Sequence, residues 1–72
     1  MKVGDILIVR KLSEIEESGG NSSDMIEGEE VKVAYVGENY ISTNGVRYGS
    51  FSIEKDENGL NWYTFFTKKG EK

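Results

Sequence analysis

The sequence predicts a small all-β domain in which five short strands form a partly open barrel. The first observation behind this prediction is a phrase that occurs twice, a glycine and an acidic residue followed by an apolar run, at residues 4–9 (GDILIV) and 28–33 (GEEVKV). The second is the regular return of turn signals between short β-rich runs, with no segment of long helical periodicity. Neither observation indicates a chemistry.

The five strands are expected over residues 2–10, 29–36, 40–43, 51–55 and 60–66. In the second strand, Val31, Val33 and Tyr35 alternate with polar residues, which is typical of a sheet with one buried face. The tight turns fall at 37–39, at Asn44-Gly45 and at 56–59. One domain over residues 1–66 with a frayed tail at 67–72 follows from this division.

The connection over residues 11–28 is the least regular part of the chain, and we expect a long loop with one helical turn. Residues 13–16 (SEIE) fit a capping box at the start of such a turn. The pair Gly19-Gly20 ends any helix. The predicted core consists of Val3, Ile6, Ile8, Val31, Val33, Tyr40, Phe51, Ile53 and Trp62.

Composition argues against an enzyme. The chain has no cysteine and no histidine, so it lacks the side chains that most often ligate metals or transfer protons near neutral pH. Residues 54–59 match the first half of a calcium loop, but Phe65 stands where the bidentate glutamate is required. We therefore expect no catalytic residues, no metal and no cofactor.

The charge distribution bears on partners. The net charge is −4, which disfavours binding to nucleic-acid phosphates. Seven acidic residues lie between Lys11 and Lys32 with no basic residue among them. The apolar run at 6–9 is too short for a signal peptide or a membrane span. We expect a soluble cytoplasmic protein that does not contact membranes.

The order of these features resembles the small SH3-like barrels encoded in bacterial, and especially bacteriophage and prophage, genomes. The matching segments are residues 3–5 (VGD), 28–33 (GEEVKV), 51–56 (FSIEKD) and 60–63 (LNWY), so the resemblance extends over about residues 3–66. It implies a five-stranded, partly open SH3-like barrel that acts as a binding module, and it implies no catalytic residues. The paired-tyrosine segment of peptide-binding eukaryotic SH3 domains is missing, so recognition of proline motifs is not implied.

Two surfaces are candidates for partner contact. One is the acidic loop, and the other is the aromatic segment of the fifth strand. Alternation puts Tyr63 and Phe65 on one face of that strand and Trp62 and Phe66 on the other, so either pair can be the partly exposed one. Each has a structural alternative: the acids are a solvated loop, or the aromatics all belong to the core of a very small domain. The candidate partner-binding residues are Glu14, Glu16, Glu17, Asp24, Glu27, Tyr63 and Phe65.

The function expected from these features is a non-enzymatic module that binds and modulates a host or cellular protein. The alternative is a small barrel that binds RNA or DNA, with exposed aromatics stacking on bases. A third hypothesis is a homodimer formed through an unpaired edge strand.

Overall fold

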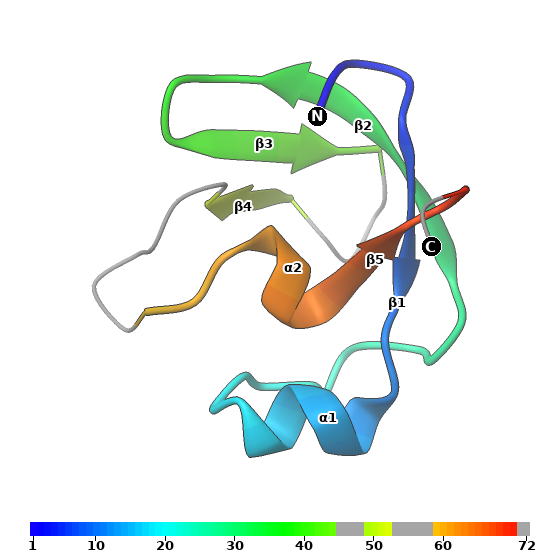
Figure 1. Cartoon of the computed structure of the whole chain (residues 1–72), viewed down its shortest axis with the longest axis vertical. Coiled ribbons are helices and arrows are strands. Elements are labelled where there is room, and N and C mark those ends of the chain that lie inside the picture. The colour runs from blue at the N-terminus through cyan, green and yellow to red at the C-terminus, as the bar shows by residue number, and fades with distance from the viewer. Residues whose placement is uncertain (45–48, 53–58, 71–72) are drawn as a thin grey trace.

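The fold is a curled, half-closed barrel made of a single antiparallel sheet. The computed structural model describes residues 1–44, 49–52 and 59–70. Its elements in chain order are β1 (Ile6–Val9), α1 (Leu12–Glu17), β2 (Glu30–Val36), β3 (Tyr40–Thr43), β4 (Ser50–Ser52), α2 (Trp62–Phe65) and β5 (Phe66–Lys68). Within these residues the five strands lie in the order β4-β3-β2-β1-β5, so β4 and β5 are at opposite ends of the sheet (Figure 1). The prediction of a small, partly open all-β barrel is confirmed.

The repeated phrase of the sequence is also a repeated structure. Gly4 and Gly28 both have a positive φ, of 99° and 84°. The amide of the next residue, Asp5 or Glu29, donates a hydrogen bond of 3.1 Å to the carbonyl three residues earlier. Both phrases are therefore four-residue turns with glycine in third place, where a type II turn requires the left-handed conformation. Each turn delivers the chain into a strand.

The two turns bracket the pairing of β1 with β2. The antiparallel register is centred on Leu7 opposite Val31. At one end, the Gly4 amide donates to the Val33 carbonyl at 2.9 Å and the Val33 amide donates to the Asp5 carbonyl at 2.8 Å. At the other end, the Gly28 amide donates to the Val9 carbonyl at 3.0 Å and the Val9 amide donates to the Glu29 carbonyl at 2.9 Å. Every bond at one end thus has a counterpart at the other. The two turn-and-strand units are related by a local two-fold axis through the Leu7–Val31 pair.

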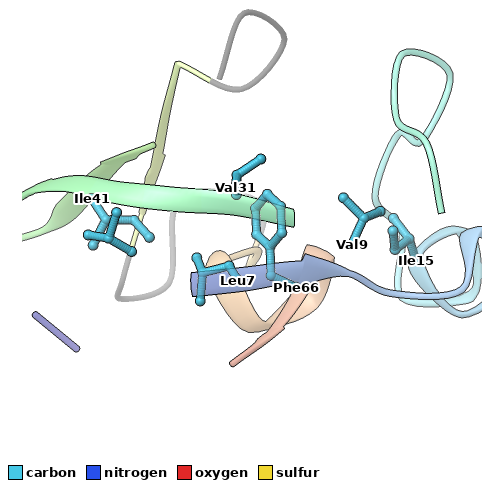
Figure 2. Packing of buried hydrophobic residues seen from close by; sticks show 7 residues of the cluster. Leu7, Val9, Ile15, Val31, Ile41 and Phe66 are labelled. Carbon is cyan, nitrogen blue, oxygen red and sulfur yellow. The ribbon is translucent and has the colours of Figure 1, made fainter. Parts of the chain in front are cut away.

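The core lies inside the curl of the sheet. Figure 2 shows Phe66 beside Leu7 and Val31, Val9 beside Ile15 of α1, and Ile41 toward the other end. The described side chains that are buried and hydrophobic are Leu7, Val9, Ile15, Val31, Val33, Ile41 and Phe66. The core therefore draws on β1, α1, β2, β3 and β5 together.

The predicted inward face of β1 is wrong. Leu7 and Val9 are buried, whereas Ile6 and Ile8, which the sequence interpretation placed in the core, are only half-buried. All four residues of the strand are apolar, so alternation gives no signal, and a shift by one residue exchanges the two faces. Val3, also expected in the core, is the second residue of the first glycine turn and is 61% exposed.

The β2–β3 hairpin reverses two further predictions, and a bulge on β2 accounts for the first of them, Tyr35. The register shifts between Val33 and Tyr35, and a bulge of this kind re-aims the side chains that follow it. Tyr35 and Tyr40, both expected to point inward, are exposed, and their rings lie 5.6 Å apart on the outer surface. Ile41 and Thr43 take the inward positions of β3.

The helical turn expected in the long loop is present as α1, but its start is not the predicted capping box. The cap position is Lys11 and Ser13 lies inside the helix. The helix ends as the two glycines predict. Gly19 has a φ of 90°, and the amides of Gly19 and Gly20 donate to the carbonyls of Glu16 and Ile15, each at 3.0 Å. These two hydrogen bonds at the end of the helix form a Schellman motif.

The fifth strand predicted over 60–66 is wrong in its position. Asn61 is extended and buried, and it begins the short helix α2. The amide of Thr64 donates to the Asn61 carbonyl at 2.9 Å, and the Asn61 amide donates to Thr64 Oγ1 at 3.5 Å. The strand forms only afterwards, when Phe66–Lys68 pairs with β1. The sheet therefore reaches two residues into the segment expected as a tail.

Aromatic rings fill the seam between the two ends of the sheet. The ring centroid of Phe51 in β4 lies 5.0 Å from that of Phe66, with the ring planes at 87°. It lies 5.2 Å from the ring centroid of Phe65, with the planes at 54°. α2 lies over this seam, between β4 and β5 (Figure 1). The predicted core residues Phe51 and Trp62 are partly buried against the core. Three predictions lie wholly or partly outside the described residues. They concern Ile53, the part of the Asn44-Gly45 turn after Asn44, and the part of the 56–59 turn before Gly59.

Replacing the turn glycines tests the two-fold arrangement. A Cβ at Gly4 or Gly28 would meet no atom within 4 Å, so an alanine there is opposed by the backbone conformation alone. We expect Gly4→Ala and Gly28→Ala each to lower the free energy of unfolding by about 1–2 kcal/mol. Gly49→Ala is the matched control, because its Cβ is equally unobstructed and its φ is not positive. Urea denaturation compares the three, and equal stabilities would contradict the assignment of both turns.

Candidate functional site

The acidic and aromatic segments of the sequence meet at one open pocket of about 450 Å³. The pocket lies where the end of β1, α1 and α2 come together with β5. Its walls include Arg10, Glu14, Trp62, Tyr63, Thr67 and Lys68. A volume of this size is in the range of small-ligand sites, and we refer to it as the α1–α2 pocket.

Arg10 is the residue that holds this pocket together. Its Nη1 donates to the carbonyl oxygens of Tyr63 at 3.1 Å and Thr64 at 3.2 Å, and its Nη2 contacts Glu14 Oε2 at 3.3 Å. Carbonyls in the last turn of a helix have no partner within the helix. One guanidinium therefore supplies the C-terminal hydrogen bonds of α2 and connects that helix to α1.

Two aromatic rings form the apolar part of the pocket. Trp62 is half-buried, and Tyr63 is 53% exposed. Their ring centroids are 5.7 Å apart and their planes stand at 83°. In α2 both of these neighbouring residues reach the pocket, whereas a strand would direct them to opposite faces.

Lys68 reaches the pocket from β5 and is connected to the first glycine turn. Its Nζ lies 3.5 Å from Asp5 Oδ2, and the same carboxylate oxygen accepts a bond of 2.9 Å from the Lys2 amide. The Lys2 hydrogen bond and the nearby Lys68 ammonium hold the pKa of Asp5 below its ordinary value of 3.8, against the opposing effect of desolvation. Asp5 thus connects β5 to the start of β1.

Of the predicted acidic residues, one lines the pocket and two support the loop. Glu14 lines the α1–α2 pocket. Glu16 accepts a 2.8 Å hydrogen bond from the buried Ser22 hydroxyl. Glu27 Oε1 accepts a 3.1 Å bond from the amide of Leu12, the first residue of α1. Glu27 therefore caps the helix from across the loop, in the role that the sequence interpretation gave to Ser13.

The remaining predicted residues lie elsewhere. Glu17 is exposed on α1. Asp24 and Phe65 line a second, smaller pocket of about 280 Å³ between the loop and the seam. Tyr63 and Phe65 were expected on one face of a strand, and this is wrong because both belong to α2. The structure brings Glu14 and Tyr63 together and separates them from Asp24 and Phe65.

Sequence reasoning missed Arg10 and Trp62 as site residues. The contact between Arg10 and Tyr63 joins positions 53 apart in the chain, so no local pattern could reveal it. Trp62 was assigned to the core because strand alternation puts it opposite Tyr63. A helix prediction for 62–65 would have placed it at the pocket, and the Asn-x-x-Thr spacing at 61–64 was the available signal.

The described residues contain no group of three or more acidic side chains placed to hold a metal ion. None of the described helices has the length and apolarity needed to cross a membrane. Comparison of the chain with protein-family models, with curated proteins and with solved structures finds no match.

The cap on α1 can be tested through Glu27. Glu27→Ala leaves the Leu12 amide without its acceptor, and we expect it to lower the free energy of unfolding by about 1 kcal/mol. Glu27→Gln retains a side-chain oxygen and should lose less. Glu17→Ala removes an exposed acid from the same charge cluster and serves as the control. If Glu27→Ala is as stable as Glu17→Ala in urea denaturation, Glu27 does not cap α1.

The Asp5 interactions predict a pH-dependent contribution to stability. Because the pKa of Asp5 is lowered in the folded protein, its stabilising effect is complete above about pH 3.8 and is lost as the pH falls through the folded value. We expect Asp5→Asn to destabilise the protein at pH 7 and the difference from wild type to shrink at acidic pH. Asp24→Asn, at an exposed position, is the control. A difference for Asp5→Asn that stays constant with pH would contradict this role.

Proposed function

We propose that this protein is a non-enzymatic protein-interaction module that binds a basic surface of a host or cellular protein and modulates it. The proposal is supported by one observation above all. The acidic helix α1 and the aromatic helix α2 are far apart in the sequence but share the α1–α2 pocket. An exposed tyrosine beside a half-buried tryptophan is the kind of composition that dominates protein-binding hot spots.

The charge of the chain favours a basic protein as partner. The net charge is −4, and Glu14, Glu16 and Glu17 all lie on α1. Complementary charge steers association and suppresses binding to acidic surfaces. We further propose that the protein is a phage or prophage accessory protein, and this part of the proposal rests on the sequence resemblance. The absence of cysteine and histidine from the chain argues for binding over catalysis.

Nucleic-acid binding is the second candidate, because Trp62 and Tyr63 lie next to two cationic side chains and could stack on bases. Those cations are already engaged. Arg10 contacts two carbonyls and Glu14, and Lys68 contacts Asp5. Phosphate binding would have to compete with each of these interactions, in an acidic protein.

Affinity capture with the tagged protein from bacterial lysate, with and without nuclease, tests the proposal. We expect one dominant protein that is retained after nuclease treatment and lost with Tyr63→Ala. Tyr40→Ala is the matched control, because Tyr40 is also an exposed tyrosine and lies in the β2–β3 hairpin. Phe65 is left unchanged, since its ring packs on Phe51 and its removal would disturb the seam.

Three outcomes would contradict the proposal. Capture that disappears with nuclease would favour nucleic-acid binding. Capture that is equal for wild type, Tyr63→Ala and Tyr40→Ala would place any contact outside the α1–α2 pocket. A captured protein that is acidic over its contact surface would contradict the expected charge complementarity.

A further inference from the structure

We propose that the α1–α2 pocket receives one cationic side chain, a lysine or an arginine, of the partner protein. The cation would lie against the rings of Trp62 and Tyr63, with the Glu14 carboxylate as its counter-ion. This inference rests on the proposed function, since it specifies which group of a basic partner enters the pocket.

The aromatic geometry suits a cation. The rings of Trp62 and Tyr63 are 5.7 Å apart and nearly perpendicular, at 83°. A cation is attracted to the face of an aromatic ring when it lies within about 6 Å of the centroid, and tryptophan is the strongest such partner. Two perpendicular rings form a corner in which a single cation can approach both. Tyr63, at 53% exposure, leaves this corner open to solvent.

The charges around the corner leave a carboxylate available and the cations engaged. Arg10 uses Nη1 for two carbonyl oxygens and Nη2 for Glu14, and its side chain is 26% exposed. Lys68 is 28% exposed and is paired with Asp5. Glu14 is 48% exposed, and its contact with Arg10 involves only Oε2. A carboxylate can accept several hydrogen bonds, so Glu14 retains capacity for an incoming donor.

An anionic group fits the same pocket poorly. It would approach the Glu14 carboxylate, on a helix that carries two further glutamates, and like charges repel at short range. It would also share the donors of Arg10 and Lys68 with the carbonyls and carboxylates that they already contact, which weakens the attraction that these cations offer. The pocket therefore discriminates by the charge of the side chain offered to it.

The inference can be tested with short peptides, because Trp62 is the only tryptophan in the chain and its indole N–H signal reports directly on the pocket. The probes are acetylated and amidated tripeptides, Gly-Arg-Gly and Gly-Lys-Gly, with Gly-Gln-Gly and Gly-Glu-Gly as neutral and anionic controls. We expect saturable shifts of the Trp62 indole signal in NMR titrations with the two cationic peptides only.

Variants assign the binding to the proposed groups. Glu14→Gln should weaken binding of Gly-Arg-Gly about fivefold, as expected for loss of one exposed ion pair, and Tyr63→Ala should weaken it by a similar factor of about fivefold. Glu17→Gln removes the same charge from the same helix outside the pocket and should leave binding within about twofold of wild type. Thermal unfolding of each variant verifies that it is folded.

Several results would overturn the inference. Equal shifts with the arginine and glutamine peptides would show that charge is not recognised, and preferential binding of the glutamate peptide would show an anion site. A single-stranded oligothymidine that shifts the Trp62 signal where the cationic peptides do not would indicate base stacking. Unchanged binding in both Glu14→Gln and Tyr63→Ala would place the cation elsewhere.

A lysine-rich twelve-residue peptide separates this inference from the proposed function. If that peptide binds wild type and Glu14→Gln equally and leaves the Trp62 signal unmoved, the protein binds basic partners without the proposed pocket contact, and only the inference fails. If the tripeptides bind as expected but lysate capture yields no protein that depends on Tyr63, the pocket recognises cations and the proposed function fails.

Discussion

The structure depends on the pairing of β1 with β2. Each strand is entered through the same kind of glycine turn, and each turn makes hydrogen bonds with the opposite strand, the first with Val33 and the second with Val9. The pair is thereby closed at both ends by backbone contacts, which is a strong constraint on register in strands whose side-chain pattern is ambiguous. Leu7 and Val31 lie directly opposite each other in this register and share the buried face. Every other strand is added to one side of this pair.

The strands on the two sides of the β1–β2 pair are connected to it in different ways. On the β2 side, β3 and β4 follow through short connections along the chain. On the β1 side, β5 arrives from the C-terminal end, and the backbone contact continues past the strand, with the Arg10 amide donating to the Phe65 carbonyl at 2.9 Å. β4 and β5 do not neighbour each other in the described sheet. Phe51, Phe65 and Phe66 close this gap by ring packing, with α2 placed over it.

The architecture was largely predictable from the sequence, because the glycine turns and the β-rich runs are local signals. Residues 30–36 and 40–43 form strands as expected, and the two glycines end α1. The orientation of β1 was not predictable, since four apolar residues in a row have no preferred face. Trp62 was misplaced for a different reason: an aromatic run has high β propensity, and the capping contacts of Asn61 and Thr64 overrode it. The pocket itself depends on Arg10, whose partners are distant in sequence.

The position of α2 has a thermodynamic consequence. The helix presents Trp62 and Tyr63 to the pocket on one side and Phe65 to the seam on the other, and Arg10 bonds its carbonyl ends. The residues proposed for recognition therefore belong to a helix that also holds the domain together. A ligand that immobilises α2 is linked to the folding equilibrium, so that occupancy and resistance to unfolding rise together. In a domain of this size, with a small core, such a ligand would stabilise the folded protein against unfolding.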